Sequence, residues 1–279
     1  MSGENDAVTG IAGGVPYVAL PPAGGRDAAP LVVAWHLNDP PRSAAAMAAA
    51  LPLSGISAWR VYLDLPMHGA RQLPGGLSEF MQLGYQDAVL KAFEPQVSQA
   101  VDEFPAALAA LRDRLPVPDG PIGLVGASIG TLPAQLVMAD GLAPVSAAAL
   151  ISPVIQLAEV VAVNERRFGV SYPWTDESQA VADRLDLVAR AAEIAGREPQ
   201  PALLMVTGGD DNPAFAEQTQ RLQAALLQRY HDPQRVAVTT IPGMAHAFAQ
   251  EPGIEPAPPT PQAQRVDAAV TDWFTRHPG

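Results

Sequence analysis

GASIG, residues 126–130, is the stretch of this chain that says most about its fold. It follows the apolar run PIGLV at residues 121–125, which is typical of a buried strand, and it leads into residues 129–139, which have helical character. A Gly-x-Ser-x-Gly pattern between a strand and a helix predicts a strained turn that raises the Ser128 hydroxyl above the edge of a sheet. The alternative is an ordinary turn in which Ser128 caps the helix, because five residues of this kind are common by chance.

Two later segments supply the residues that a serine nucleophile needs. The run ALLMVT at residues 202–207 leads to Asp210 and Asp211, and the run VAVTTI at residues 236–241 leads to His246. A histidine must accept the serine proton, and a carboxylate must hold that histidine in the required tautomer. The order serine, aspartate, histidine, with each residue after a strand, favours a catalytic triad over isolated turn or surface residues.

Predicted strands and helices alternate along the rest of the chain. Strands are expected at residues 15–20, 31–35, 58–63, 121–125, 147–152, 202–207 and 236–241, and helices at residues 44–51, 79–93, 96–115, 129–139, 176–195 and 262–275. The helix at 79–93 is expected to start at a Ser78 cap, and Pro105 to kink the next helix or begin it. Continuous apolar runs such as LVVAW indicate strands buried on both faces of a sheet. We therefore expect an α/β fold with a mostly parallel central sheet flanked by helices.

These features resemble the α/β-hydrolase superfamily, in particular its esterase, lipase and dienelactone-hydrolase-like members, over most of the chain. The resemblance implies that Ser128 is the nucleophile and that His246, in a Gly-x-x-His loop, is the base. It also implies that the acid is Asp211, three residues after Gly208, with Asp210 as the alternative. The expected structure is the α/β-hydrolase fold with a small helical cap insertion.

The same resemblance points to two backbone amides that form an oxyanion hole. They belong to Leu37, which follows His36 and stands where relatives have glycine, and to Ile129, which follows the nucleophile. Residues 62–71 resemble the superfamily's D-x-x-G-H-G-x-S loop and keep its histidine as His68. His36 and His68 are expected to be hydrogen-bonding residues near the site rather than bases, and His36 is also assigned to the substrate-binding surface.

Residues 153–200 form a long segment between the strand after Ser128 and the strand before the acid. One crossover helix needs far fewer residues, and the resemblance places a cap or lid here, which would exclude water during acyl transfer. Phe168, Tyr172 and Trp174 cluster in this segment and are assigned to the substrate-binding surface. The alternative is that these aromatic residues only anchor a loop.

Composition disfavours several classes of function. The net charge of −12, from 29 acidic and 17 basic residues, disfavours nucleic acid and anionic membranes as partners. Without cysteine, a zinc-ligand spacing or a Walker loop, the sequence predicts no metal and no cofactor. The first ten residues lack signal-peptide character and no apolar run approaches about 18 residues, so we expect a cytoplasmic, single-domain protein over residues 1–279. A homo-oligomer is left open.

The sequence as a whole predicts a serine hydrolase that cleaves a carboxylic ester of a small or medium-sized substrate through an acyl-enzyme. A thioesterase, lactonase or amidase with the same triad is the main alternative, because fold resemblance does not select a substrate. A catalytically silent binding protein with this fold is the second alternative.

Overall fold

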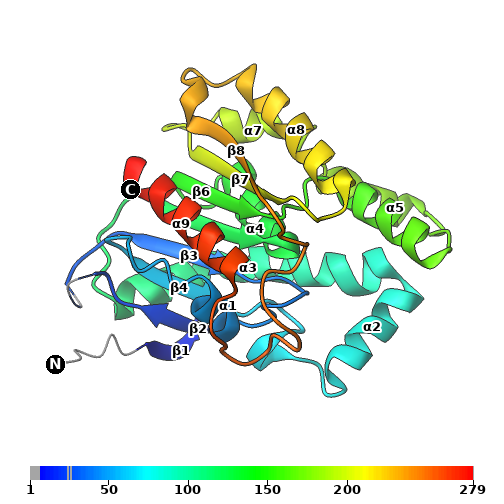
Figure 1. Ribbon diagram of the computed structural model, residues 1–279, viewed down its shortest axis with the longest axis horizontal. Coiled ribbons are helices and arrows are strands. Elements are labelled where there is room, and N and C mark those ends of the chain that lie inside the picture. Colours follow the sequence, from blue (N-terminus) through cyan, green and yellow to red (C-terminus); the bar gives the residue numbers. More distant parts are fainter. Residues whose placement is uncertain (1–6, 24, 26, 279) are drawn as a thin grey trace.

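One central sheet organises the molecule (Figure 1). The computed structural model describes residues 7–23, 25 and 27–278, and within them the sheet has eight strands in the order β1-β2-β4-β3-β5-β6-β7-β8. The strands are β1 (Val8–Ala12), β2 (Val15–Leu20), β3 (Leu31–Trp35), β4 (Trp59–Leu63), β5 (Ile122–Ala127), β6 (Val145–Ile151), β7 (Ala202–Gly208) and β8 (Val236–Ile241). The pairs β1–β2 and β2–β4 are antiparallel and all other pairs are parallel. The predicted α/β class and mostly parallel sheet are confirmed.

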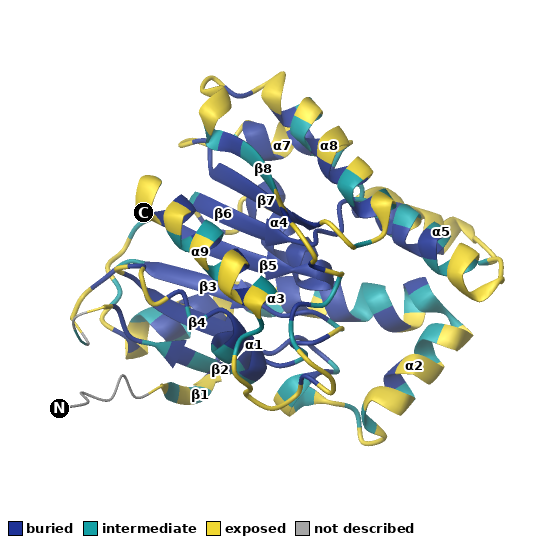
Figure 2. Ribbon diagram, viewed as in Figure 1, coloured by how far each residue is buried: buried dark blue, intermediate teal, exposed yellow. Residues whose placement is uncertain are grey.

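Helices cover both faces of the sheet. Helices α1 (Ala44–Ala50) and α9 (Pro261–Arg276) pack on one face. The opposite layer contains α3 (Glu94–Arg114), α4 (Thr131–Asp140), α7 (Ala191–Ala195) and α8 (Pro213–Leu227). Each face has its own apolar core, and Figure 2 shows buried strands between helices whose outer faces are exposed. None of these helices, nor any other in the described ranges, is long and apolar enough to span a membrane.

Several elements differ from their predicted form for local reasons. Strand β1 was not predicted, because VTGIA is short, contains a glycine and is buried on only one side. The predicted Ser78 cap is wrong, since α2 (Gly76–Gln86) already begins at Gly76. The predicted helix 79–93 is divided at Asp87, whose extended backbone and N-capping carboxylate start a separate π-helix, η2 (Ala88–Phe93). Pro105 lies inside α3 and does not begin it.

The segment predicted as a cap, residues 153–200, contains three helices. They are α5 (Leu157–Phe168), α6 (Asp176–Arg184) and α7. Helix α7 packs on α4 and α8 and so belongs to the layer beside the sheet, whereas α6 contacts η2. Figure 1 shows α5 and α2 projecting beyond the edge of the sheet at which the parallel strands end, the carboxyl edge. That edge carries the candidate site.

Candidate active site

The turn after β5 places Ser128 in a strained conformation. Ser128 has a φ of 48° and begins a short 3-10 turn, η3 (Ser128–Gly130). A Cβ at Gly126 would lie 2.5 Å from the carbonyl oxygen of Gly130, and a Cβ at Gly130 would overlap the carbonyl oxygen of His36. Only glycine fits both positions, so the turn packs directly against the end of β3. The structure therefore has the strained strand-to-helix turn that the sequence predicts.

Loops after β7 and β8 bring an aspartate and a histidine to this serine. The Ser128 Oγ lies 2.6 Å from Nε2 of His246, and Nδ1 of His246 lies 2.8 Å from Oδ2 of Asp211. With Nδ1–H donating to the carboxylate, Nε2 is free to accept the serine hydroxyl proton. The three residues that the sequence singles out thus form one continuous hydrogen-bonded series.

The geometry distinguishes Asp211 from its neighbour. Only 6% of the Asp211 side chain is exposed, and its Oδ1 accepts the amide of Asn212 at 2.6 Å. Asp210 is exposed and contributes its backbone amide to Met244, which ties the two loops together. Phe215, in α8, packs its ring 4.5 Å from that of His246. Helix α8 was not predicted, and no sequence pattern pointed to Phe215.

The predicted oxyanion donor Leu37 needs correction. Its amide donates to the carbonyl oxygen of Pro41 at 3.3 Å, and its side chain is fully buried. The next amide, that of Asn38, donates no hydrogen bond within the described residues. Ile129 lies in the first turn of η3, where backbone N–H groups lack an intrahelical acceptor. The available pair of amides near Ser128 is therefore Asn38 and Ile129.

Asn38 is held by a buried amide of α3. Its Nδ2 donates to Oε1 of Gln96 at 3.0 Å, and Nε2 of Gln96 donates back to Oδ1 of Asn38 at 2.8 Å. Gln96 is fully buried and also lies 3.0 Å from Nδ1 of His68. This reciprocal pair fixes the loop after β3 relative to α3. Sequence patterns do not reveal it, because the two residues are far apart in the chain.

His36 is a structural residue, and its assignment to the substrate-binding surface is wrong. The ring is fully buried, Nδ1 donates to the carbonyl oxygen of Leu37 at 2.6 Å, and Nε2 accepts the amide of Leu65 at 3.1 Å. Burial lowers the pKa of His36 to about 4, so the ring is neutral at pH 7. No part of it is left to contact a substrate.

The loop after β4 is built around a second buried histidine and a carboxylate. Asp64 accepts the amides of Ala44 and Ala70, at 2.7 and 3.0 Å, and a Cβ at Gly69 would overlap that carboxylate. Burial lowers the pKa of His68 to about 3 and raises that of Asp64. His68 and Gly69 thus stabilise the loop, in line with the predicted hydrogen-bonding role of His68.

The three aromatic residues of the insertion lie at a cavity whose wall does not include the triad. Phe168 and Tyr172 line a cavity of about 280 Å³ between α2 and α5, and neither Ser128 nor His246 is part of its wall. Trp174 is outside the wall and packs edge-on against Tyr172, with ring centroids 4.8 Å apart. Their role in substrate binding stays a prediction.

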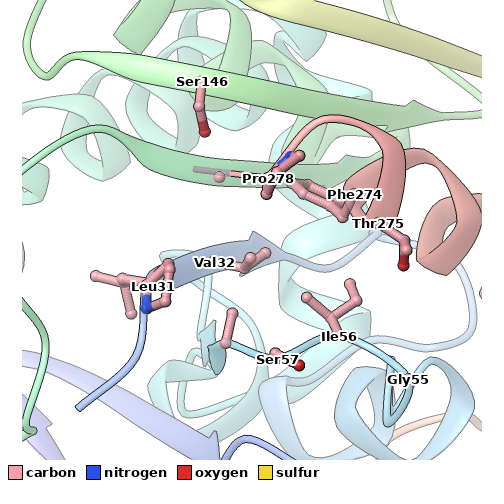
Figure 3. A pocket seen from close by; sticks show the side chains of 12 residues that line it. Leu31, Val32, Gly55, Ile56, Ser57, Ser146, Phe274, Thr275 and Pro278 are labelled. Carbon is pink, nitrogen blue, oxygen red and sulfur yellow. The ribbon is translucent and has the colours of Figure 1, made fainter.

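A second cavity, of about 220 Å³, lies at the opposite edge of the sheet, the amino edge, at which the parallel strands begin (Figure 3). Its wall includes Leu31 at the start of β3, Ser146 near the start of β6, and Phe274 of α9. None of the triad residues lines it. Across the described ranges we find no group of three or more histidine, aspartate or glutamate side chains that could hold a metal ion.

Comparisons by sequence identify no relative, since no protein-family profile matches the chain and no curated protein matches it. Solved structures do match. TT1662 from Thermus thermophilus shares 18% identity at a TM-score of 0.63, with 96% of this chain and 98% of that chain covered. Carboxyl esterase 2 from the fungus Tuber melanosporum shares 16% identity at a TM-score of 0.57, with 99% and 89% covered.

A longer protein also matches. The acylaminoacyl peptidase of Pyrococcus horikoshii shares 13% identity at a TM-score of 0.61, with 98% of this chain but only 42% of that chain covered. The chain thus spans less than half the length of this peptidase. Together with the sheet order and the turn after β5, these similarities show that the chain has the α/β-hydrolase fold.

Proposed function

We propose that this protein is a serine hydrolase that cleaves a carboxylic ester. The observation that carries the proposal is the hydrogen-bonded series from Ser128 through His246 to Asp211. A serine with a φ of 48° is costly to hold, and strained residues of this kind cluster at active sites. A histidine bonded to both a hydroxyl and a buried carboxylate is the arrangement that activates serine for attack.

The reaction proceeds in two stages. The Ser128 Oγ attacks the ester carbonyl as Nε2 of His246 takes its proton, and the resulting imidazolium is stabilised by Asp211. His246 then protonates the leaving alcohol, which leaves an acyl group on Ser128. Water, deprotonated by the same histidine, attacks this acyl-enzyme and releases the carboxylic acid. No metal or cofactor takes part in these steps.

Two amides stabilise the negative charge on the carbonyl oxygen in this scheme. One is that of Ile129, and we assign the other to Asn38, because the amide of Leu37 is bonded to Pro41. The turn at Gly130 packs on the carbonyl oxygen of His36, which brings the loop after β3 next to Ser128. Each donor of this kind contributes about 3–4 kcal/mol to transition-state stabilisation.

A carboxyl esterase is among the similar structures, which supports an ester as the substrate. Thioesters remain the nearest alternative, because the same triad cleaves them. Comparing an acyl-CoA with a p-nitrophenyl ester of the same acyl group separates the two substrates.

Covalent labelling tests the proposal directly. A fluorophosphonate probe should label the wild type, and Ser128→Ala should abolish labelling and lower kcat for a p-nitrophenyl ester by about 10⁶-fold. Ser152→Ala is the matched control, because Ser152 also has a positive φ, of 43°, at the end of the neighbouring strand but is fully buried. Equal labelling of the wild type and Ser128→Ala would contradict the assignment.

A further inference from the structure

We infer that the cavity between α2 and α5 binds the uncharged hydrocarbon chain of the substrate's acyl group. The inference rests on the proposed hydrolase function and extends it to a substrate class. It concerns a cavity of about 280 Å³ whose wall is formed by α2, η2, α5 and the loop after α5. By comparison, an apolar cavity of about 150 Å³ is large enough for benzene.

The wall of this cavity is mostly apolar and aromatic. Its side chains include Phe80, Phe93, Val161, Phe168 and Tyr172, and no lysine or arginine lines it. Apolar walls with few polar groups are typical of small-molecule sites. A hydrocarbon group gains about 0.8 kcal/mol for each methylene that it buries, which corresponds to about a fourfold gain in kcat/KM when the gain is made in the transition state.

The two acidic residues in the wall disfavour an anionic ligand. Asp87 accepts the phenol of Tyr172 at 2.6 Å and the amide of Leu90 at 2.8 Å, and Glu165 accepts the amide of Tyr172 at 2.6 Å. These carboxylates are engaged in fixing the wall, and no cation in the wall would balance a ligand carboxylate or phosphate. The ligand group that fits this site is therefore neutral.

The α5 side of the cavity is bonded to the turn that holds Ser128. Strands β5 and β6 end side by side, with Ala127 paired to Ile151, and α5 begins a few residues later. The amide of Val154, in this connection, donates to Oγ1 of Thr131 at 3.1 Å, and the Thr131 hydroxyl donates to the carbonyl oxygen of Ser128 at 2.6 Å. This wall is thus fixed relative to the nucleophile.

The α2 side of the cavity is linked to the loop that carries the second amide. Phe80 packs edge-on against His68, with ring centroids 4.6 Å apart, and His68 lies 3.0 Å from Gln96, which pairs with Asn38. The phenol of Tyr172, after α5, donates to Asp87, after α2, and this hydrogen bond joins the two walls across 85 residues of sequence. Burial raises the pKa of Tyr172 to about 12, so its phenol remains a donor at neutral pH. Both walls are therefore held in place relative to Ser128 and Asn38.

Gly84 offers a way to fill the cavity. It lies in the wall, and a Cβ built on it meets nothing within 4 Å. Gly84→Phe should place a ring in the cavity without a backbone clash. Gln82→Phe adds the same ring to the same helix at an exposed position outside the wall, and so serves as the matched control.

The test compares p-nitrophenyl acetate, butanoate, hexanoate and octanoate on the three proteins. In the wild type and Gln82→Phe, kcat/KM should rise by about fourfold per added methylene until the cavity is full. In Gly84→Phe the hexanoate and octanoate should lose about tenfold or more, while acetate changes by less than about twofold. The mono-p-nitrophenyl ester of adipate should react at least about tenfold more slowly than the hexanoate.

Two results would overturn the inference while leaving the hydrolase function standing. One is a wild-type kcat/KM that does not depend on chain length, and the other is a Gly84→Phe variant that slows acetate and octanoate equally. If the fluorophosphonate probe fails to label the wild type, the proposed function itself fails. The cavity is then tested alone by thermal unfolding with 1-octanol, which should stabilise the wild type and Gln82→Phe but not Gly84→Phe; equal shifts in all three proteins would reject the site.

Discussion

The two edges of the sheet each hold a cavity of similar size, about 280 Å³ at the carboxyl edge and 220 Å³ at the amino edge, yet they differ in chemistry. At the amino edge, Ser146 donates to the carbonyl oxygen of Ile122, and neither an acid nor a histidine lines the cavity (Figure 3). At the carboxyl edge, the loops after β5, β7 and β8 supply a serine, an aspartate and a histidine within hydrogen-bond distance. Cavity volume alone therefore does not locate the function.

The difference follows from the direction of the strands. Parallel strands end at one edge, so the loops after β5, β7 and β8 meet there and their side chains converge. The segments that line the cavity at the amino edge instead lead into β3, β4 and β6, and most of the side chains they contribute are apolar. Variants at the two edges should accordingly separate activity from stability.

Among the residues that support Ser128, the largest loss of kcat is expected at the triad acid. Asp211→Asn should lower kcat by about 10⁴-fold, because the amide no longer holds His246 in the tautomer that accepts the serine proton. Asp210→Asn is the matched control and should retain kcat within about twofold, since its side chain is exposed. Steady-state kinetics with a p-nitrophenyl ester measure both. A loss in Asp210→Asn that exceeds the loss in Asp211→Asn would reverse the assignment.

The next largest loss of kcat is expected when the backbone amide of Asn38 is removed. Asn38→Pro removes the backbone N–H and should lower kcat by about 10²–10³-fold. Asn38→Ala keeps the N–H and loses only the pair with Gln96, so its loss should be smaller, about tenfold. Circular dichroism checks that both variants are folded. Equal kcat values for the two variants would argue against a role for this amide.

The sequence predicts the carboxyl edge well where residues close together in the chain decide the structure. The GASIG turn, the apolar strands and the order of Ser128, Asp211 and His246 all depend on local patterns. Strands β2, β3 and β8 have the predicted limits, because continuous or alternating apolar runs end at turn residues. The fold class follows from these elements.

The sequence does not predict features that depend on the path of the backbone. The amide of Leu37 is bonded to Pro41, and His36 satisfies both of its nitrogen atoms with main-chain groups, which only the folded loop reveals. The hydrogen bond between Tyr172 and Asp87 joins segments 85 residues apart. Tertiary contacts of this kind decide which amide is available and which aromatic residues form a cavity.

Acid should lower the free energy of unfolding by protonating His36. Its pKa in the folded protein is about 4, below the ordinary value of 6.5, so protons bind more strongly to the unfolded chain. The stabilisation is therefore complete above pH 6.5 and is lost as the pH falls towards 4, by about 3 kcal/mol in total. Urea unfolding of the wild type at several pH values should show this loss. His36→Gln has no titratable group at this position, so its free energy of unfolding should fall less between pH 6.5 and pH 4. Parallel stability curves for the two proteins would contradict the prediction.

The smallest effect on activity is expected at the amino edge. A Cβ at Gly123 would lie 2.5 Å from Cε1 of Phe274 and 2.9 Å from Cγ2 of Val32, so Gly123→Ala should lower the free energy of unfolding by about 1–3 kcal/mol. Gly84→Ala at the carboxyl edge meets open space within a helix and should raise it by about 0.5–1 kcal/mol. Both variants should keep kcat/KM for a short ester within about twofold, because neither changes the triad. A large loss of kcat/KM in folded Gly123→Ala would show that the two edges are coupled through β5, and the separation of function from packing would then fail.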